Sequence, residues 1–473
     1  MISLLAAFFG LLVVGLLFRS NRAAFVAGFF ILFSLIYRIV DILYLDLFGP
    51  TFAIELGRYV GGNIATPMFV LCCFAFLVPL WIVYRPAAMA RKLGAQLPDL
   101  PYYASLRRWA FPGCAGFIGL VYLDMLRKGT IPLLVGMDRL DYNVIAGVLH
   151  NPLYELSFIL TTTLGIFTVL PRLQGGRFDL RFAILFLAIL FYWILTGNRF
   201  SIFYREISFF LLPFAAVLAM EAHGKLAKIS RRDAWSAIVS SRVVVPMAAV
   251  LAAGTLTGLL INNFYDVRNY ADPLFQMTQR AFVQPVQFWD VTWAHTDFAR
   301  DLTPSRDALR QVFVNPINPD GNTTIQYLMS RELGYFRAAR LIGFGQQYAG
   351  GYPEIFFDLF GPWIGLVLIV LLGVVSALLL RLSTVALTQG KLFTSLMAVY
   401  VYFGFSLTYI GGMLNFVLAP SFAAKIIILL LAMYLEGAVV ANVQRPRGTA
   451  RPPRRSLARQ FGPLPGNAGK GGQ

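Results

Sequence analysis

Charged residues, histidines and cysteines are all scarce in this sequence. Only 13% of the 473 residues are Asp, Glu, Lys or Arg, whereas 58% are hydrophobic. A soluble domain carries about 25% charged residues, so the composition excludes an ordinary soluble protein and predicts a polytopic, all-α membrane protein. Cys72, Cys73 and Cys114 all lie inside apolar runs, where a cysteine is usually a small buried residue. The sequence therefore predicts no disulfide framework.

The motifs of several large enzyme classes are missing as well. The three histidines, His150, His223 and His295, are isolated from one another, and there is no HExxH, DxD, Walker or GxSxG motif. These absences disfavour metal, ATP and serine-hydrolase chemistry, and we predict neither a metal nor a cofactor. The net charge is +17, but no basic face interleaves with aromatic residues, so we predict no nucleic-acid partner.

Apolar runs long enough to cross about 30 Å of hydrocarbon recur along the chain. We expect about eleven transmembrane helices, at Leu4–Phe18, Ala24–Tyr44, Ala65–Tyr84, Trp109–Leu126, Leu153–Leu170, Phe182–Thr196, Ser201–Met220, Val243–Ile261, Ile355–Leu380, Phe393–Ile410 and Ala419–Leu435. Basic residues gather in alternate loops, which the positive-inside rule makes cytoplasmic. The prediction is a multi-pass protein of the bacterial inner membrane, with its N-terminus in the periplasm and its C-terminus in the cytoplasm.

The loop between the eighth and ninth spans, residues 262–354, is much longer than any other connection. Long insertions in compact membrane domains are usually functional. Thr303-Pro304 predicts a helix that stops before Pro316, and Asn322 or Thr323 predicts a cap for a second helix that ends at Gly334. Five aromatic residues of the loop are expected to pack on the interface or the bundle: Trp289, Trp293, Tyr327, Tyr335 and Phe336.

The sequence divides into two parts. Residues 1–441 form the membrane-embedded domain, which includes the large periplasmic loop. Residues 442–473 are rich in Arg, Pro and Gly, and we predict a disordered basic tail that rests on anionic inner-leaflet lipid.

Eight charged residues lie inside or beside the apolar runs, near the ends that the predicted topology turns to the exterior. They are Arg38, Asp41, Asp124, Glu155, Arg199, Glu206, Glu354 and Asp358. A charge at the bilayer centre costs at least about 3 kcal/mol, so such residues normally line a wet cavity or pair with each other. We therefore expect a shared polar chamber at the exterior face.

The exterior loop after the fourth predicted span runs from Lys128 to Tyr142. Its glycines and proline make a semi-rigid turn that presents Asp138, Arg139 and Asp141. One interpretation is a surface turn whose charges neutralise one another. The other is that Arg139 holds a phosphate or a sugar hydroxyl while an aspartate orients it.

Arg199 lies in a tight connection, residues 196–201, between the sixth and seventh spans. It is either an interfacial anchor or a guanidinium fixed for bidentate binding of a pyrophosphate. Glu206 is two helical turns further along the same face, whereas Arg205 is expected to point elsewhere and to snorkel.

The end of the long loop reads Gly350-Gly351-Tyr352-Pro353-Glu354, and Asp358 follows one helical turn after Glu354. Carboxylates in the first turn of a helix favour the positive end of its dipole, which gives a purely structural interpretation. The alternative is that one of them is a general base facing the chamber.

Together these loops resemble the bacterial oligosaccharide repeat-unit polymerases, also called O-antigen polymerases. The resemblance rests on four segments over residues 120–420: Gly129–Leu133, Gly197–Arg199, Gln279–Gln287 and Gly350–Glu354. It implies a metal-independent, GT-C-type glycosyltransferase that polymerises polyprenyl-pyrophosphate-linked repeat units into O-antigen, capsule or exopolysaccharide. The residues that it assigns to catalysis are Glu354, Asp138 and Asp141, and those that it assigns to substrate binding are Arg139, Arg199, Arg280, Gln287 and Tyr352.

This chemistry agrees with the residue types present. Sugar transfer from a pyrophosphate builds negative charge on the leaving group, which without a metal only Arg or Lys stabilises. The acceptor hydroxyl must lose a proton, which suits a carboxylate or a histidine. The implied partners are the lipid-linked oligosaccharide, membrane lipids and a chain-length regulator protein.

Two alternatives stay open. A flippase or transporter uses intramembrane charges as a substrate path, although such proteins more typically show internal repeats or broken helices near the midplane. The related O-antigen ligase is the second alternative, and His295 keeps it open.

Overall fold

The computed structural model describes residues 1–85, 101–135, 139–198, 200–227, 272–296, 323–343 and 350–444, with the single positions 89, 93, 137, 310 and 348. Within these residues, regular structure other than helix is confined to one antiparallel hairpin. It consists of β1 (Thr51–Ala53) and β2 (Arg58–Val60), with Phe52 opposite Tyr59.

The helices follow one another through the chain with short connections. They are α1 (Ile2–Ser20), α2 (Arg22–Ala27), α3 (Phe29–Phe48), α4 (Thr66–Val83), α6 (Pro101–Arg127), α7 (Pro132–Val135), α8 (Arg139–Ile145), α9 (His150–Leu173), α10 (Leu180–Leu195), α11 (Phe200–Leu211), α12 (Phe214–Ala222), α15 (Pro273–Thr278), the π-helix η2 (Gln279–Val283), α16 (Gln287–Ala294), α18 (Thr324–Leu333), α19 (Tyr335–Gly343), α20 (Glu354–Thr388), α21 (Leu392–Ile410), the 3₁₀ turn η3 (Leu414–Leu418) and α22 (Pro420–Gln444).

The chain is a helical membrane protein. Among the described residues, seven helices are long and apolar enough to cross a membrane, and an eighth span is added if α11 and α12, which are bent by 42° at their junction, are one span. Helix α10 has only 16 residues, and α3 carries Arg38, Asp41 and Asp46. The predicted run at 243–261 lies outside the described residues, and each of the other predicted runs coincides with one or two helices. The expected count of eleven therefore stays a prediction.

Glycine breaks the regular pattern where a predicted span bends. In α20, Gly361 has φ +74°, a left-handed conformation that favours glycine, and Pro362 follows it. The helix is consequently divided into a short first segment, which begins at Glu354, and a long second segment. The first segment carries both Glu354 and Asp358 into the bundle.

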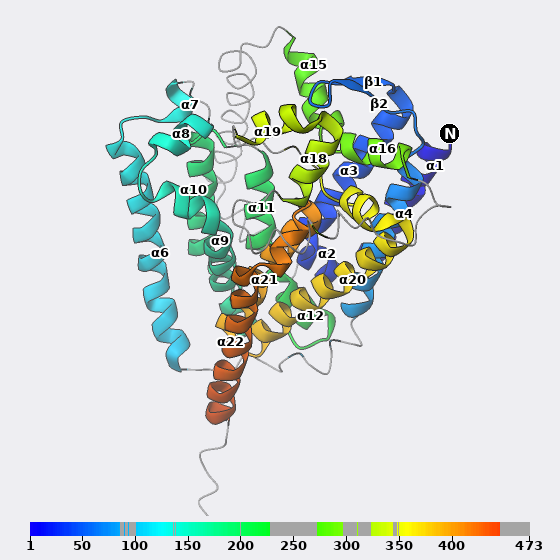
Figure 1. Cartoon of the computed structure of the whole chain (residues 1–473). Helices are drawn as coiled ribbons and strands as arrows, with labels where there is room; N and C mark the ends of the chain where they lie inside the picture. Colours follow the sequence, from blue (N-terminus) through cyan, green and yellow to red (C-terminus); the bar gives the residue numbers. More distant parts are fainter. Residues whose placement is uncertain are drawn as a thin grey trace, which may run out of the picture.

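The two ends of the bundle differ in what covers them (Figure 1). At the upper end of the picture, the hairpin and helices α7, α8, α15, α16, α18 and α19 lie over the ends of the long helices; we call this the capped end. At the opposite end, which we call the basic end, α4, α9, α20 and α22 finish, and α6 and α10 begin. The capped end is the side that the topology prediction assigns to the exterior.

Contacts at the basic end join loops that the sequence assigns to the cytoplasm. Asn21, between α1 and α2, donates a hydrogen bond to the Tyr84 carbonyl at 2.9 Å, and the Tyr84 hydroxyl lies 2.7 Å from Thr384 Oγ1 near the end of α20. Lys225 Nζ donates to the Leu93 carbonyl at 2.7 Å. The predicted alternation of loops agrees with this arrangement, while the orientation in a membrane remains a prediction.

One predicted helix of the long loop is confirmed in detail. Thr323 caps α18 through a capping box with Gln326, and Gly334 ends the helix with φ +77°. This is the cap and the stop that the sequence predicts. The helix expected between Thr303 and Pro316 lies outside the described residues. All three cysteines are free, as predicted.

Candidate functional site

The first feature of the candidate site is an ion pair buried inside the bundle. Arg38, near the middle of α3, places Nη2 at 2.9 Å and 3.1 Å from the two carboxylate oxygens of Glu354, the first residue of α20. Glu354 is fully buried and Arg38 is 7% exposed. Nη1 of Arg38 also donates to the Tyr352 carbonyl, and the Gly351 N–H donates to Glu354. Glu354 is thus held by Arg38 and by the turn that precedes α20.

Glycines allow this turn to enter the bundle. Gly350 and Gly351 have φ of +148° and +136°, and a Cβ on Gly351 would lie 2.2 Å from the Gly412 nitrogen. Two backbone segments therefore approach more closely than any side chain permits. Tyr352, a predicted substrate-binding residue, is 2% exposed, and its hydroxyl donates to the Cys72 carbonyl of α4. Its ring belongs to the core of the bundle.

Asp358 belongs to a separate network at the capped end. Arg331 of α18 contacts the Asp358 carboxylate and also donates to Glu332 Oε1 at 2.6 Å, while Arg58 of β2 contacts Glu332. Burial raises the pKa of Glu332, but Arg331 and Arg58 outweigh that effect and hold the pKa below its ordinary value. The network fastens the hairpin and α18 to α20. The two carboxylates that the sequence places on one helix face therefore have different partners.

Helix α16 is fastened to the hairpin region by polar contacts. Gln287, a predicted substrate-binding residue, is fully buried and donates to the Glu55 carboxylate. Asp290 accepts hydrogen bonds from the Gly61 N–H at 2.7 Å and from Asn63 Nδ2 at 2.9 Å. Burial raises the pKa of the Asp290 carboxyl group. These contacts give Gln287 a structural role in the described conformation.

The indole rings of the predicted aromatic set also fasten this cap, whereas two other rings do not. Trp289 is fully buried and donates to the Ala65 carbonyl at 3.2 Å, and Trp293 donates to the Asn63 carbonyl at 3.0 Å. Tyr335 and Phe336 of α19 are 70% and 89% exposed. These two exposed rings are the ones available to a membrane interface.

The π-helix η2 carries Arg280, another predicted substrate-binding residue, and lies along α3. The Tyr37 hydroxyl donates to the Ala281 carbonyl at 2.5 Å, and the rings of Tyr44 and Phe282 stack with centroids 4.9 Å apart. Arg280 is half-buried. Single π-helical turns occur frequently at functional sites, which the sequence pattern alone does not reveal.

A second buried ion pair lies between α9 and α11. Glu206 is fully buried and accepts hydrogen bonds from Ser157 Oγ at 2.6 Å and Thr161 Oγ1 at 2.9 Å. Arg205 Nη2 lies 2.8 Å from Glu206 and also donates to the Tyr154 carbonyl at 3.0 Å. The expectation that Arg205 points away and snorkels is wrong, because its guanidinium is bound between the two helices.

His150 is not isolated in the fold. Its Nδ1 lies 2.8 Å from the Tyr192 hydroxyl and its Nε2 lies 2.9 Å from Asn143 Oδ1, and it is 1% exposed. Asp124 of α6 accepts a hydrogen bond from the Leu149 N–H at 3.0 Å, just before α9. These contacts join α6, α8, α9 and α10, and linear spacing could not indicate them.

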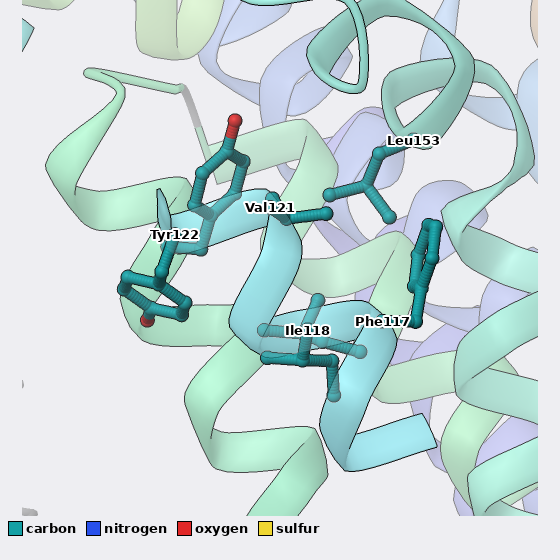
Figure 2. Close-up of a pocket in the computed structure, with 7 residues that line it drawn as sticks. Phe117, Ile118, Val121, Tyr122 and Leu153 are labelled. Carbon is teal, nitrogen blue, oxygen red and sulfur yellow. The ribbon is translucent and has the colours of Figure 1, made fainter. Parts of the chain in front are cut away.

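A small pocket lies beside this cluster, between α6, α9 and α10. Figure 2 shows Val121 and Leu153 pointing toward one another across it. Its other lining residues are Phe117, Ile118, Tyr122, Ile189 and Tyr192. The lining is almost entirely apolar and includes neither Arg38 nor Glu354, so the pocket is not where the charged chemistry gathers.

The remaining predicted site residues lie in the early capped-end loops. Asp141 is exposed in the first turn of α8, and Glu155 is exposed on α9. Asp138 and Arg199 lie outside the described residues, as does the side chain of Arg139, whose backbone begins α8. The turn that contains Arg199 is as short as predicted, because α10 ends at Leu195 and α11 begins at Phe200.

The charged residues thus form several groups at the capped half of the bundle. Arg38 with Glu354, Arg205 with Glu206, and Arg331 with Asp358 are distinct pairs. Chemically, the arrangement offers guanidinium groups for anions and carboxylates that are held at fixed positions. The group around Arg38 and Glu354 is the most deeply buried, and it lies directly against the turn that ends the long loop.

A family described as a family of unknown function (DUF6418) matches residues 318–435 of the chain. The matched segment takes in α18–α21 and most of α22, and it includes Glu354 and Asp358. No curated protein and no solved structure matches the chain. The match covers less than half of the sequence.

Proposed function

We propose that this protein polymerises polyprenyl-pyrophosphate-linked oligosaccharide repeat units into a surface polysaccharide at the periplasmic face of a bacterial inner membrane. The proposal combines the resemblance of four segments to the repeat-unit polymerases with the charged groups at the capped half of the bundle. In this proposal the capped end faces the periplasm, where the lipid-linked substrates are presented.

The observation that carries the proposal is the buried pair between Arg38 and Glu354 beneath the segments of the late loop. An ion pair in the interior is weak evidence for stability, because well-packed apolar residues often replace one without loss. Charged side chains inside a membrane protein normally serve a substrate or ion path. A pair that is joined to the turn ending the longest loop fits a site for a charged, lipid-tethered substrate.

The reaction forms one glycosidic bond at each step. The hydroxyl oxygen of the acceptor sugar attacks the anomeric carbon of the donor, and the bond from that carbon to the pyrophosphate oxygen breaks. The electron pair leaves with the pyrophosphate, whose developing charge requires guanidinium groups. Arg139, Arg199 and Arg280 come from three different capped-end segments and are the proposed donors of that stabilisation. The proton of the acceptor passes to a carboxylate.

Deletion of the gene, followed by gel analysis of the surface polysaccharide, tests the proposal. A polymerase deletion leaves single repeat units attached to the surface, and re-expression restores the ladder of chain lengths. A ligase deletion instead leaves lipid-linked polymer unattached, and a flippase deletion delivers nothing to the surface. An unchanged ladder contradicts the proposal.

A further inference from the structure

Asp41 is a carboxylate buried on α3 with its hydrogen-bonding capacity unused. It is 0% exposed, and neither carboxylate oxygen has a hydrogen-bond partner among the described residues. Every other carboxylate of this region has donors: Glu354 has Arg38, and Asp358 has Arg331. An unpartnered buried carboxylate is costly, so Asp41 does not contribute to stability as the paired carboxylates do.

The position of Asp41 links the buried pair to the π-helix. Arg38 is three residues before Asp41 on α3 and is its nearest charged influence. Tyr37, Asp41 and Tyr44 have the spacing of one helix face. Tyr37 and Tyr44 of this face contact Ala281 and Phe282 of η2. Asp41 therefore lies between two contacts that hold η2, the segment carrying Arg280, against α3.

We propose that Asp41 is the general base of the polymerisation and that Glu354 positions Arg38. This inference rests on the proposed function and identifies which carboxylate of its site accepts the proton. A general base needs a free lone pair within reach of the hydroxyl that it deprotonates. The Glu354 oxygens accept from Arg38 and from the Gly351 N–H, whereas both Asp41 oxygens are unoccupied.

The proton balance of the step is simple. As the acceptor oxygen bonds to the anomeric carbon, its O–H bond breaks and the proton forms an O–H bond with an Asp41 oxygen. The pyrophosphate departs with the electron pair of the broken anomeric bond. The acceptor hydroxyl approaches along the face of α3 that η2 covers, and Arg280 on η2 is placed to meet the departing phosphates.

Asp41→Asn separates this role from a structural one, because it keeps the shape and removes the charge. If Asp41 only fills space, a neutral amide leaves polymerisation unchanged, since no hydrogen bond is lost. If Asp41 is the base, the variant reaches a normal level in the membrane and loses at least about 100-fold in polymer formation, which is within the usual contribution of a general base. Its thermal midpoint is unchanged or higher, because a buried unpaired charge is gone.

Asp46→Asn on the same helix is the matched control. Asp46 accepts hydrogen bonds from Ser3 Oγ and from the backbone of Ala65 and Thr66 at 2.7–3.0 Å. Its substitution should lower the thermal midpoint while polymer formation per molecule changes little. The two variants therefore predict opposite patterns of stability and activity.

The assay compares chain-length ladders in the deletion strain with wild-type protein titrated down to the level of each variant by immunoblot. Asp41→Glu, which keeps a carboxylate, should retain polymer and serves as the readout if Asp41→Asn does not accumulate. Normal ladders from Asp41→Asn at matched level, or loss of polymer from Asp41→Glu at a normal level, overturn the assignment. If wild-type protein itself restores no ladder, the proposed function fails instead, so the two failures are distinguishable.

Discussion

Arg38 and Glu354 lie 316 positions apart in the sequence, yet one nitrogen of the Arg38 guanidinium contacts both oxygens of the Glu354 carboxylate. The contact joins the middle of α3 to the first residue of α20. It fixes the depth at which the late loop ends inside the bundle. The geometry of the candidate site therefore depends on this pair more than on any single loop.

The pair should show strong energetic coupling. Removing one partner leaves a buried charge uncompensated, so Arg38→Met or Glu354→Gln alone should cost about 3–5 kcal/mol of stability. The double variant should cost clearly less than the sum of the two, because both charges are then absent. Unfolding of the detergent-purified variants, followed by tryptophan fluorescence, measures the coupling. Single effects that add within about 0.5 kcal/mol would show that the contact is not formed.

The same variants separate positioning from catalysis at Glu354. If Glu354 is the base, Glu354→Gln at normal expression yields no polymer. If it positions Arg38, polymer formation per folded molecule is reduced but measurable in Glu354→Gln, and the main loss is in protein level. Ladder intensity normalised to immunoblot signal distinguishes the two results.

Topology is the second prediction. Because basic loops alternate along the sequence and meet at one end of the fold, reporter fusions at Gln174 and in the C-terminal tail should read cytoplasmic. Fusions at Asp138 and Pro319 should read periplasmic. A periplasmic reading for the tail would reverse the membrane orientation and place the capped end away from lipid-linked substrates.

Metal independence is the third prediction, and it follows from the absence of DxD and histidine-ligand spacings in the sequence. Purified enzyme should keep its polymerising activity in excess EDTA. Activity that disappears with EDTA and returns with Mg²⁺ or Mn²⁺ would count against guanidinium groups as the only stabilisers of the leaving group.

The fourth prediction concerns Arg199 in the short turn between α10 and α11. Lysine cannot reproduce a bidentate guanidinium contact, so Arg199→Lys should lose polymer formation by about 10²–10³-fold at normal expression. Arg181→Lys at the basic end is the control, because that exposed residue pairs only with Asp179 and Phe111 among the described residues and should tolerate the change. Normal chain lengths from Arg199→Lys would leave Arg199 as an interfacial anchor, which lysine replaces by snorkelling.

Local signals in the sequence predicted the local structure well. Apolar runs predicted the long helices, Thr323 and Gly334 predicted both ends of α18, and the short connection around Arg199 predicted a tight turn. These features depend on residues close together in the chain, where capping, periodicity and glycine conformations act directly.

Partners across the fold could not be predicted in the same way. Arg38 and Glu354 were both recognised as charges in apolar runs, but their pairing depends on which helices pack together and at what depth. His150 looked isolated because Asn143 and Tyr192 carry no motif that links them to a histidine. The unpartnered state of Asp41 emerges only after every other carboxylate of the region has been given its donors.

Polymerisation by the purified protein is the most direct test of the central claim. Full-length protein in liposomes, supplied with polyprenyl-pyrophosphate-linked repeat units from its own host, should extend them into a ladder and release one polyprenyl pyrophosphate for each glycosidic bond formed. Both products are measured, the ladder on a gel and the released lipid by chromatography. Movement of the lipid-linked units across the bilayer without any lengthening, or no reaction with protein that is folded and correctly oriented, would contradict the account.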